Sequence, residues 1–352
     1  MNKSESSHTY PLSFIWPPEE LETVSCCPVC MSPENYSLYD ELVDDVFLVA
    51  PGRWALKKCN RCASAYISPR PMVENMSKAY GNYYTHKTGA VQEKIADISF
   101  LRFVRRILAN GYLNSKYGSK RKPSIQIGAW ILQVFPRLTS VLDAQYRFLP
   151  KPLCGQSLLD IGCGNGDFLL KANEVGWHAI GLEPDLKAAQ TAQKMGLEVI
   201  AGDIDSIKNN SNMYDVITLS HVIEHVHEPR MLLNAVYRLL KDGGLLYIDT
   251  PNINSYGASY FQKKWRGIEA PRHLVLFNHK SLIQLLRECG FENIQIKRRV
   301  DVQKGMYLIS KQLADKCNYI KNNRFWLVKF MMLMPFLKTN RLEYITLIAR
   351  KN

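Results

Sequence analysis

A glycine-rich turn near the middle of the chain constrains the fold more than any other feature. The run from Ser157 to Phe168 reads SLLDIGCGNGDF, an apolar strand followed by three alternating glycines and then helix-forming residues. Glycine lets the backbone approach a ligand where a Cβ would collide. Dinucleotide-binding turns have GxGxxG spacing, whereas this turn is GxGxG with Asp160 ahead of it. The carboxylate disfavours an anionic ligand and favours a cofactor with a positive amino or sulfonium group.

Strands and helices alternate after this turn. The pattern predicts a helix over 186–195, a second helix ending in Lys241-Asp-Gly-Gly, and further strands over 177–183, 197–203, 214–220 and 243–252. Alternation of this kind predicts an α/β fold with a parallel sheet covered on both faces, and ligands bind at the carboxyl ends of such strands. Because Asp160, Glu183 and Asp203 all lie at strand ends, we expect their carboxylates to converge.

The motif around Asp160 resembles motif I of class I S-adenosylmethionine-dependent methyltransferases. The resemblance implies a Rossmann-like seven-stranded sheet in which Asp160 and the glycines hold the methionine half of the cofactor. Glu183 would accept the ribose hydroxyls, and Asp203 would read the adenine amino group. The residues that the resemblance assigns to the cofactor are Asp160, Gly162, Gly164, Gly166, Glu183, Asp203, Ile204, Ser220 and His221.

Four cysteines near the start of the chain form two CxxC pairs, Cys27 with Cys30 and Cys59 with Cys62. Two thiolate pairs at this spacing can surround Zn2+ tetrahedrally, and plausible strands over 45–50 and 54–58 lie between them. Cys26 competes with Cys27 as a ligand, although the CxxC spacing favours Cys27. Four protein ligands leave no open position, so we expect a structural zinc ribbon with no part in the chemistry.

A PRP turn (69–71) and an aromatic cluster (80–86) follow the cysteines. This layout resembles bacterial methyltransferases that carry an N-terminal zinc-binding region and are related to quinone and sugar methyltransferases. The resemblance implies that the cluster, including Tyr83 and Tyr84, forms a lid at the cofactor mouth, with Tyr84 near the substrate. Ordinary packing of these rings is the alternative.

The segment after the strand over 214–220 reads SHVIEHVHEP, with His221, Glu224 and His225 on one face of a helical turn. Imidazole beside a carboxylate suits removal of a proton from an acceptor, so His225 oriented by Glu224 is the first candidate base. Binding of a divalent ion by the same pair, or simple solvation, are the alternatives. HxxEH is also a zinc-peptidase motif, but it requires a long helix, and Pro229 interrupts this segment.

A second segment, WRGIEAPRHLVLF over 265–277, resembles a stretch that follows strand five in the same family. The resemblance places Trp265 at the substrate pocket and makes His273 the rival base. Arg272 could anchor an acidic or phosphorylated substrate, or could be a buried salt-bridge partner that holds the loop.

The end of the chain supplies strands over 292–297 and 342–350, split by a basic, apolar insertion at 300–340. We therefore divide the chain into a zinc ribbon (1–75), a basic and amphipathic helical lid or linker (76–150), the methyltransferase core (151–300), and the insertion with the last strand (301–352).

Charge is distributed unevenly along the 352 residues, whose formal net charge is +13. Residues 101–150 carry nine Lys/Arg and one Asp, and residues 297–352 carry thirteen Lys/Arg and three Asp/Glu, so the remaining residues are mildly acidic. Apolar runs at 101–108, 125–135 and 325–337 accompany these charges. Helices packed on the core, an interface with anionic lipid headgroups, and a nucleic-acid grip are the three interpretations. No apolar run is long enough for a membrane span and no signal peptide is recognised, so we expect a cytoplasmic protein, with peripheral contact to the inner face of the membrane as an extension.

The predicted function is S-adenosylmethionine-dependent methyl transfer to a small-molecule, glycan or lipid-linked acceptor, in cell-surface polysaccharide or secondary metabolism. An RNA-modifying methyltransferase that uses the ribbon and the basic flanks is the alternative. The segment SHVIEH lacks the Asn/Asp-Pro-Pro-aromatic tetrapeptide typical of base-amino methylation, which disfavours nucleic acid. A nicotinamide oxidoreductase and a non-catalytic interaction module are further alternatives, disfavoured by the glycine spacing and by the intact acids.

Overall fold

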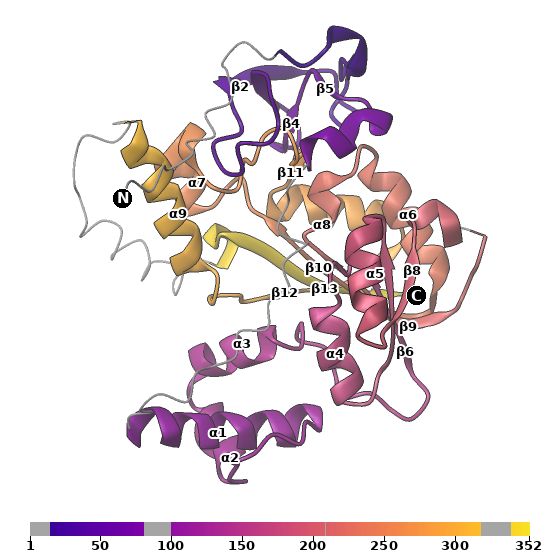
Figure 1. The fold of residues 1–352 in the computed structure, drawn as a ribbon, viewed down its shortest axis with the longest axis vertical. Coiled ribbons are helices and arrows are strands. Elements are labelled where there is room, and N and C mark those ends of the chain that lie inside the picture. The colour runs from indigo at the N-terminus through magenta and orange to yellow at the C-terminus, as the bar shows by residue number, and fades with distance from the viewer. Residues whose placement is uncertain (1–14, 81–99, 208, 318–338) are drawn as a thin grey trace, which may run out of the picture.

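The computed structural model describes residues 15–80, 100–207, 209–317 and 339–352. Its centre is a seven-stranded sheet in the order β12-β13-β10-β9-β6-β7-β8 (Figure 1). Six strands run in the same direction, and β13 is antiparallel to both of its neighbours. The strand bounds are β6 (Ser157–Ile161), β7 (His178–Glu183), β8 (Glu198–Ala201), β9 (Tyr214–Ser220), β10 (Leu240–Pro251), β12 (Phe291–Lys297) and β13 (Tyr344–Lys351).

Apolar residues on both faces of this sheet are buried, as expected of parallel strands. Along β6, Leu158 belongs to one core cluster, while Leu159 and Ile161 belong to the other. The first cluster includes residues of α4 (Asp167–Glu174) and α5 (Leu186–Lys194), and the second includes residues of α6 (Pro229–Leu239) and α8 (His279–Glu288). The predicted α/β fold with helices on both faces is therefore confirmed.

The cysteine region forms a second sheet, in the order β11-β4-β3-β2. Three of its strands come from the N-terminal region, β2 (Asn35–Leu42), β3 (Trp54–Cys59) and β4 (Ala65–Ile67), and a short pair, β1 (Leu21–Glu22) with β5 (Arg70–Pro71), lies beside them. The fourth strand, β11 (Val275–Leu276), comes from the second half of the chain. The ribbon is therefore joined to the main body through a shared sheet, as the upper part of Figure 1 shows.

Three helices lie below the main sheet in Figure 1, namely α1 (Phe100–Tyr117), α2 (Gly128–Gln133) and α3 (Pro136–Ala144). A network around Asp143 holds them together, because its carboxylate accepts hydrogen bonds from Tyr112 Oη at 2.9 Å, Tyr117 Oη at 2.8 Å and Lys116 Nζ at 2.8 Å. Near the opposite end, α7 (Tyr256–Phe261) and α9 (Gln303–Lys316) pack together against the ribbon core. No helix of the described ranges is both long enough and apolar enough to cross a bilayer.

Two predicted elements differ from the structure. The strand expected over 45–50 is a turn, because the Asp44 carboxylate accepts hydrogen bonds from the amides of Phe47, Val49 and Ala50 and so competes with sheet pairing. The helix expected to end in Lys241-Asp-Gly-Gly stops at Leu239, and β10 begins at once, with a register shift between Leu240 and Leu245. The part of the insertion over 318–338 lies outside the described residues.

Candidate functional site

The glycine turn after β6 has the backbone that its sequence predicts. Gly162, Gly164 and Gly166 have positive φ values of 70°, 56° and 84°, a region that favours glycine. A Cβ added to Gly164 would meet no atom within 4 Å, so open space lies beside it. The turn leads directly into α4 at the carboxyl edge of the sheet. We call its three glycines, Gly162, Gly164 and Gly166, the glycine cradle.

Two of the three predicted cofactor carboxylates are buried at this edge. Glu183 is the last residue of β7, and its carboxylate accepts hydrogen bonds from Gly164 N at 2.7 Å and Asp185 N at 3.0 Å. Burial raises the pKa of Glu183. Asp160 is fully buried and contacts Arg147 and Thr218, while its Oδ2 has no hydrogen-bond partner among the described residues. Asp203 is exposed, just beyond β8. An unpartnered buried carboxylate oxygen beside an open glycine cradle fits a cofactor with a cationic amino group.

Arg147 is a residue of this edge that sequence reasoning missed. It follows α3 and has a positive φ of 53°. Its guanidinium forms an ion pair with Asp160 and lies 3.6 Å from the centroid of the Phe168 ring. No motif marks it, because its position depends on how the helical segment joins the sheet.

The predicted catalytic segment follows β9 as a single 3-10 turn, Ile223–His225. His221, at a positive φ of 58°, lies between two buried carboxylates, with Nδ1 3.3 Å from Glu224 Oε1 and Nε2 3.5 Å from Asp249 Oδ2. Thr250 Oγ1 donates to Glu224 Oε2 at 2.9 Å. Sequence reasoning missed Asp249, although its place near the end of β10 follows the same strand-end rule as Asp160.

The three candidate catalytic residues come together. The ligand atoms of Glu224, His225 and His273 all lie within 4.8 Å of one another, and the two imidazole rings meet edge to face with centroids 4.7 Å apart. His221 is not part of this group, and the turn is too short to place His221 and His225 as paired ligands. The peptidase geometry is therefore not formed.

Backbone carbonyls fix the tautomers of both histidines. His225 Nδ1 lies 3.1 Å from Arg272 O, and His273 Nδ1 lies 2.8 Å from Gly267 O. A carbonyl oxygen only accepts, so each Nδ1 carries a proton, and in the neutral form of each ring Nε2 keeps the lone pair. Tyr80 Oη also lies 3.0 Å from His225 Nδ1. The site therefore holds two nitrogen lone pairs beside a carboxylate.

Electrostatics keep this carboxylate ionised. Burial opposes the charge of Glu224, but the hydrogen bond from His221 and the nearby histidines lower its pKa to about 2. His273 is buried, and burial lowers its pKa to about 4. His225 is only half-buried, so of the two imidazoles it is the more accessible to an acceptor.

Arg272 and Trp265 are core residues and correct the expectation that they bind substrate. Arg272 is fully buried and donates to both oxygens of Asp44, at 2.9 and 2.5 Å, to Glu269 Oε1 at 3.1 Å and to Ala79 O at 2.9 Å. It is the salt-bridge partner that the sequence left as the alternative. Trp265 Nε1 donates to the buried carboxylate of Glu343 at 2.7 Å. Tyr83 and Tyr84 lie outside the described residues.

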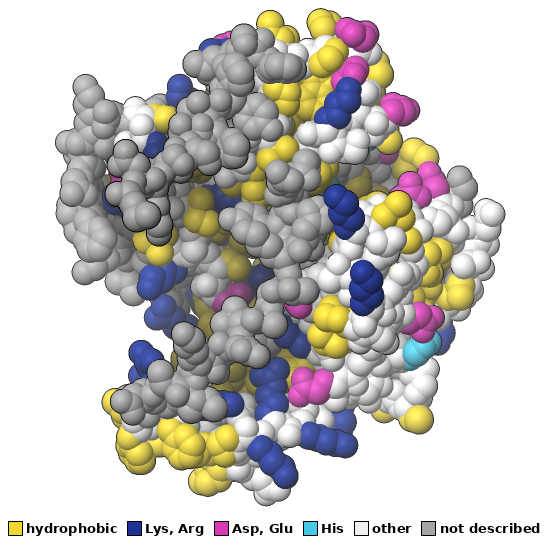
Figure 2. Space-filling model, viewed as in Figure 1, with side chains coloured by type: hydrophobic (Ala, Val, Ile, Leu, Met, Phe, Trp, Pro, Cys, Tyr) yellow, Lys and Arg dark blue, Asp and Glu magenta, His cyan; other side chains and the backbone are white. Residues whose placement is uncertain are grey.

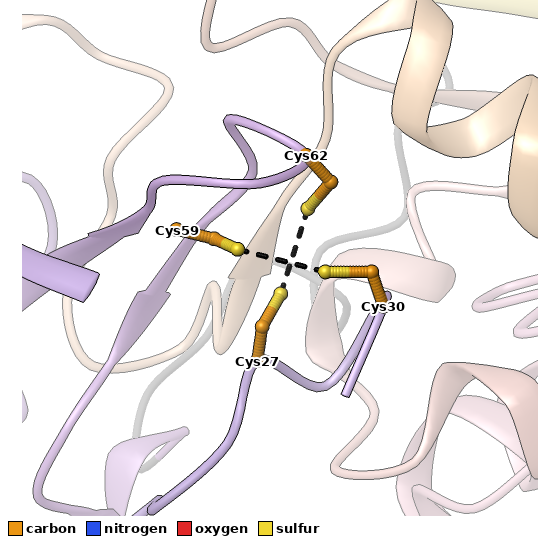
Figure 3. A group of neighbouring side chains, drawn as sticks. All are labelled: Cys27, Cys30, Cys59 and Cys62. Carbon is orange, nitrogen blue, oxygen red and sulfur yellow. Dashed lines mark hydrogen bonds between the residues drawn. The ribbon is translucent and has the colours of Figure 1, made fainter. Parts of the chain in front are cut away.

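The four cysteines converge from two equivalent turns (Figure 3). Met31 N donates to Cys27 O and Ala63 N donates to Cys59 O, and both Met31 and Ala63 have positive φ, 58° and 57°. The Sγ atoms lie 3.6 Å apart for Cys27 and Cys62 and 3.5 Å apart for Cys30 and Cys59. A tetrahedron of thiolates about 2.3 Å from zinc has edges of about 3.8 Å, so the quartet fits that metal. Cys26 is not part of the group.

Comparisons with known proteins agree with this architecture. Residues 133–296 match a family model described as "Methyltransferase domain". The chain is 30% identical over 112 residues to the mitochondrial ubiquinone biosynthesis O-methyltransferase of Rattus norvegicus, covering 29% of this chain and 32% of that protein. It is 32% identical over 111 residues to the ubiquinone biosynthesis O-methyltransferase of Erwinia tasmaniensis, covering 29% and 45%. The chain thus spans a third to a half of these two relatives.

Two other similarities cover a larger share of the protein that is compared. An uncharacterized protein of Methanocaldococcus jannaschii is 26% identical over 161 residues, covering 46% of this chain and 75% of that protein. Among solved structures, a SAM-dependent methyltransferase from Archaeoglobus fulgidus is 20% identical with a TM-score of 0.42, covering 63% of this chain and 99% of that one.

Proposed function

Since residues 133–296 belong to the Methyltransferase domain family and lie in a sheet with the class I strand order, we propose that this S-adenosylmethionine-dependent enzyme methylates a hydroxyl group. The acceptor is a small molecule, either free or as part of a glycan or lipid carrier. One observation carries the proposal, namely that His225 Nε2 keeps its lone pair at the carboxyl edge of the sheet that also bears the glycine cradle. The relatives named as O-methyltransferases support a hydroxyl acceptor.

The chain's own residues supply binding and proton transfer. When bound, the cofactor offers a methyl group on a sulfonium centre, which any aligned nucleophile can attack. Gly162, Gly164 and Asp160 would hold its amino-acid half, and the Glu183 carboxylate would accept the ribose hydroxyls. His225 Nε2 takes the proton of the acceptor hydroxyl, and the carbonyl of Arg272 keeps the ring in the required tautomer.

The negative charge beside the histidines supports this step. Protonated His225 is an imidazolium close to the ionised Glu224 carboxylate, which stabilises the positive charge formed during transfer. His221 and Thr250 hold that carboxylate by hydrogen bonds and fix its direction. Glu224 is therefore a positioning and charge-stabilising residue, while His225 contacts the acceptor.

Glu224, His225 and His273 also make up a candidate divalent-ion site, since one carboxylate and two imidazoles are suitable ligands. In that case the ion, rather than free imidazole, would lower the pKa of the hydroxyl. Turnover with Zn2+ restored to the cysteine quartet, but without Mg2+ or Mn2+, distinguishes the two, because a histidine base needs no further ion. Restoration of turnover by added Mg2+ or Mn2+ after chelation would favour the ion.

We further propose that the cysteine quartet binds one structural Zn2+. The four sulfur atoms fit a closed tetrahedral site, and two of the cysteines are buried within the main apolar cluster. The metal would hold the ribbon against the catalytic segment, because Tyr80 and Arg272 contact both regions. It takes no part in the transfer.

A cofactor-binding measurement tests the reaction class. Gly164→Ala adds a Cβ at a positive φ inside the cradle, whereas Gly243→Ala imposes a similar strain, at φ 74° with open space, near the opposite, amino end of the neighbouring strand β9. Titration calorimetry with S-adenosylmethionine should show binding to the native chain and to Gly243→Ala, and at least about tenfold weaker binding to Gly164→Ala. No heat with the folded native protein would overturn the proposal.

A turnover measurement then ranks the histidines. We expect His225→Ala to lower kcat by about 10²- to 10⁴-fold with cofactor binding retained, and His273→Ala to lower it less. The acceptor is found by adding labelled cofactor to lysate separated into lipid, glycan, RNA and small-molecule pools. Label confined to RNA would contradict a small-molecule acceptor.

A further inference from the structure

The helices α2 and α3 carry an apolar stripe that faces away from the molecule. Ile127, Trp130 and Val134 are three and four residues apart and therefore lie on one side of the helical segment. Trp130 is 78% exposed and Val134 72% exposed, although a stripe with this spacing normally faces a core. The inner side is filled instead by small residues and by Leu132.

The first turn of α1 extends this exposed surface. The backbones of α1 and α2 touch, because a Cβ on Gly111 would lie 1.9 Å from Ile125 O and one on Gly128 would lie 2.3 Å from Leu108 O. From these two contacts the segments run antiparallel, so the start of α1 points toward the end of α2. Phe100 there is 78% exposed. We call the surface formed by Phe100, Leu101, Ile127, Trp130, Val134 and Phe135 the α1–α3 apolar face, and Figure 2 shows hydrophobic side chains gathered at this lower end of the molecule.

Positive charge accompanies the α1–α3 apolar face. Arg102, Arg105 and Arg106 are exposed at helical spacing on α1. Between residues 100 and 142 the chain has eight Lys/Arg and no Asp or Glu. Apolar side chains rimmed by cations are the combination that anionic headgroups and the acyl boundary of a bilayer attract together.

Other occupants fit less well. A second copy of the chain would bring the same arginine cluster near itself, with like charges opposed. A nucleic acid would neutralise the arginines and could stack on Trp130, but it would leave the exposed aliphatic Ile127 and Val134 without an apolar partner. A bilayer surface satisfies both parts, since Trp130 suits the headgroup boundary and the arginines suit the phosphates.

We propose that the α1–α3 apolar face docks peripherally on a bilayer that contains anionic lipid. Docking would place the edge that carries the cofactor cradle near the membrane, because the chain leaves α3 and reaches Arg147, which pairs with Asp160. Lipid binding does not depend on methyl transfer, so the two proposals can fail separately. If both hold, acceptors dissolved in or attached to lipid become accessible.

Vesicle co-sedimentation of the full chain tests the proposal. The vesicles are phosphatidylcholine alone or phosphatidylcholine with about one third phosphatidylglycerol, at low salt and at about 0.5 M salt. We expect binding to the anionic vesicles at least about tenfold tighter than to the neutral ones, and weaker binding at high salt. The Trp130→Ser/Val134→Ser pair and the Arg102→Gln/Arg105→Gln/Arg106→Gln triple should each weaken it at least about tenfold.

Met231→Ser is the matched control, because Met231 is 69% exposed on α6, away from this face, and should bind like the native chain. Three outcomes overturn the proposal: no vesicle binding at low salt, equal loss in the control, or vesicle binding that neither variant changes. Sedimentation velocity and anisotropy with an RNA oligonucleotide serve as further arms. If the native chain forms a dimer or binds RNA, does not bind vesicles, and loses that dimer or RNA complex in the variants, the face is assigned to that other partner.

Discussion

The ribbon and the α1–α3 helices both lie outside the seven-stranded sheet, yet they are attached in different ways. The ribbon shares strand β11 with the second half of the chain and buries the Arg272–Asp44 ion pair at the junction. Its Cys27 and Cys59 belong to the same apolar cluster as β6 and β9. The helical unit packs one side into the core cluster that contains residues of β6 and α4, but leaves Phe100 and Trp130 exposed. An added region can thus be joined to the rest of the chain through a shared strand, or pack one side on the core and keep the other as a surface for something else.

The largest effect is expected when one zinc ligand of the ribbon is removed. Cys59→Ser should abolish zinc binding and destabilise the ribbon by several kcal/mol, because structural zinc contributes folding free energy directly. Catalysis should fall too, since Tyr80 and the Arg272 carbonyl hold His225 from that side. Metal analysis by mass spectrometry, thermal unfolding and turnover measure the three effects.

Cys26→Ser is the control for that variant. Cys26 adjoins a ligand but lies outside the quartet, so zinc content and the melting temperature should stay near the native values. A Cys59→Ser protein that still holds one zinc per chain would show that the ribbon site is misassigned.

The next effect concerns the buried ion pair at the junction. Arg272→Met leaves the Asp44 carboxylate buried without its charge partner, whereas Glu269 keeps Arg266, and the loss costs about 3–5 kcal/mol of unfolding free energy. Arg53→Met breaks an exposed pair with Glu41 in the same ribbon sheet and should cost less than about 1 kcal/mol. Urea unfolding compares the two variants. Equal losses of unfolding free energy in the two variants would mean that the buried ion pair at the junction contributes no more to stability than an exposed pair.

A smaller effect appears on acidification. Burial lowers the pKa of His279, at the start of α8, to about 4. Because this folded pKa is below the ordinary value of about 6.5, the unfolded chain takes up the proton first, and stability falls as the pH drops from about 6.5 to about 4. The contribution is about 3 kcal/mol at most. His279→Gln should flatten the fall in unfolding free energy between pH 7 and pH 5, as measured by urea unfolding at each pH.

The smallest expected effect is on the helical unit. Trp130→Ser/Val134→Ser should change the unfolding free energy by less than about 0.5 kcal/mol, because both side chains are already exposed. Trp54→Ala, at a buried ring of the ribbon, should cost about 3–5 kcal/mol. A large loss in the Trp130→Ser/Val134→Ser protein, measured by urea unfolding, would show that the α1–α3 apolar face packs within the chain.

Features carried by local pattern could be predicted from sequence, whereas features set by distant contacts could not. The glycine turn, the strand-end acids Asp160 and Glu183, and the cysteine quartet each depend on a few neighbouring residues, and the structure places them where the pattern predicts, whereas Asp203 is exposed. Arg272 was ambiguous because its partner Asp44 lies 228 residues away. Arg147 carries no motif, since only the path from α3 into the sheet brings it to Asp160. The failed strand over 45–50 has a local cause instead, because the Asp44 carboxylate accepts hydrogen bonds from three nearby amides, which the apolar pattern of the segment does not reveal.

The sharing of β11 restricts how this protein could be rearranged by recombination. Residues 133–296, the stretch recognised as a domain by similarity, include Val275–Leu276, which finish a sheet begun more than two hundred positions earlier. A gene fusion that exchanged this stretch alone would leave the edge of β4 without its neighbour. The ribbon and the methyltransferase domain are therefore expected to be inherited together. Any change in the acceptor has to arise by substitutions within a chain that keeps both.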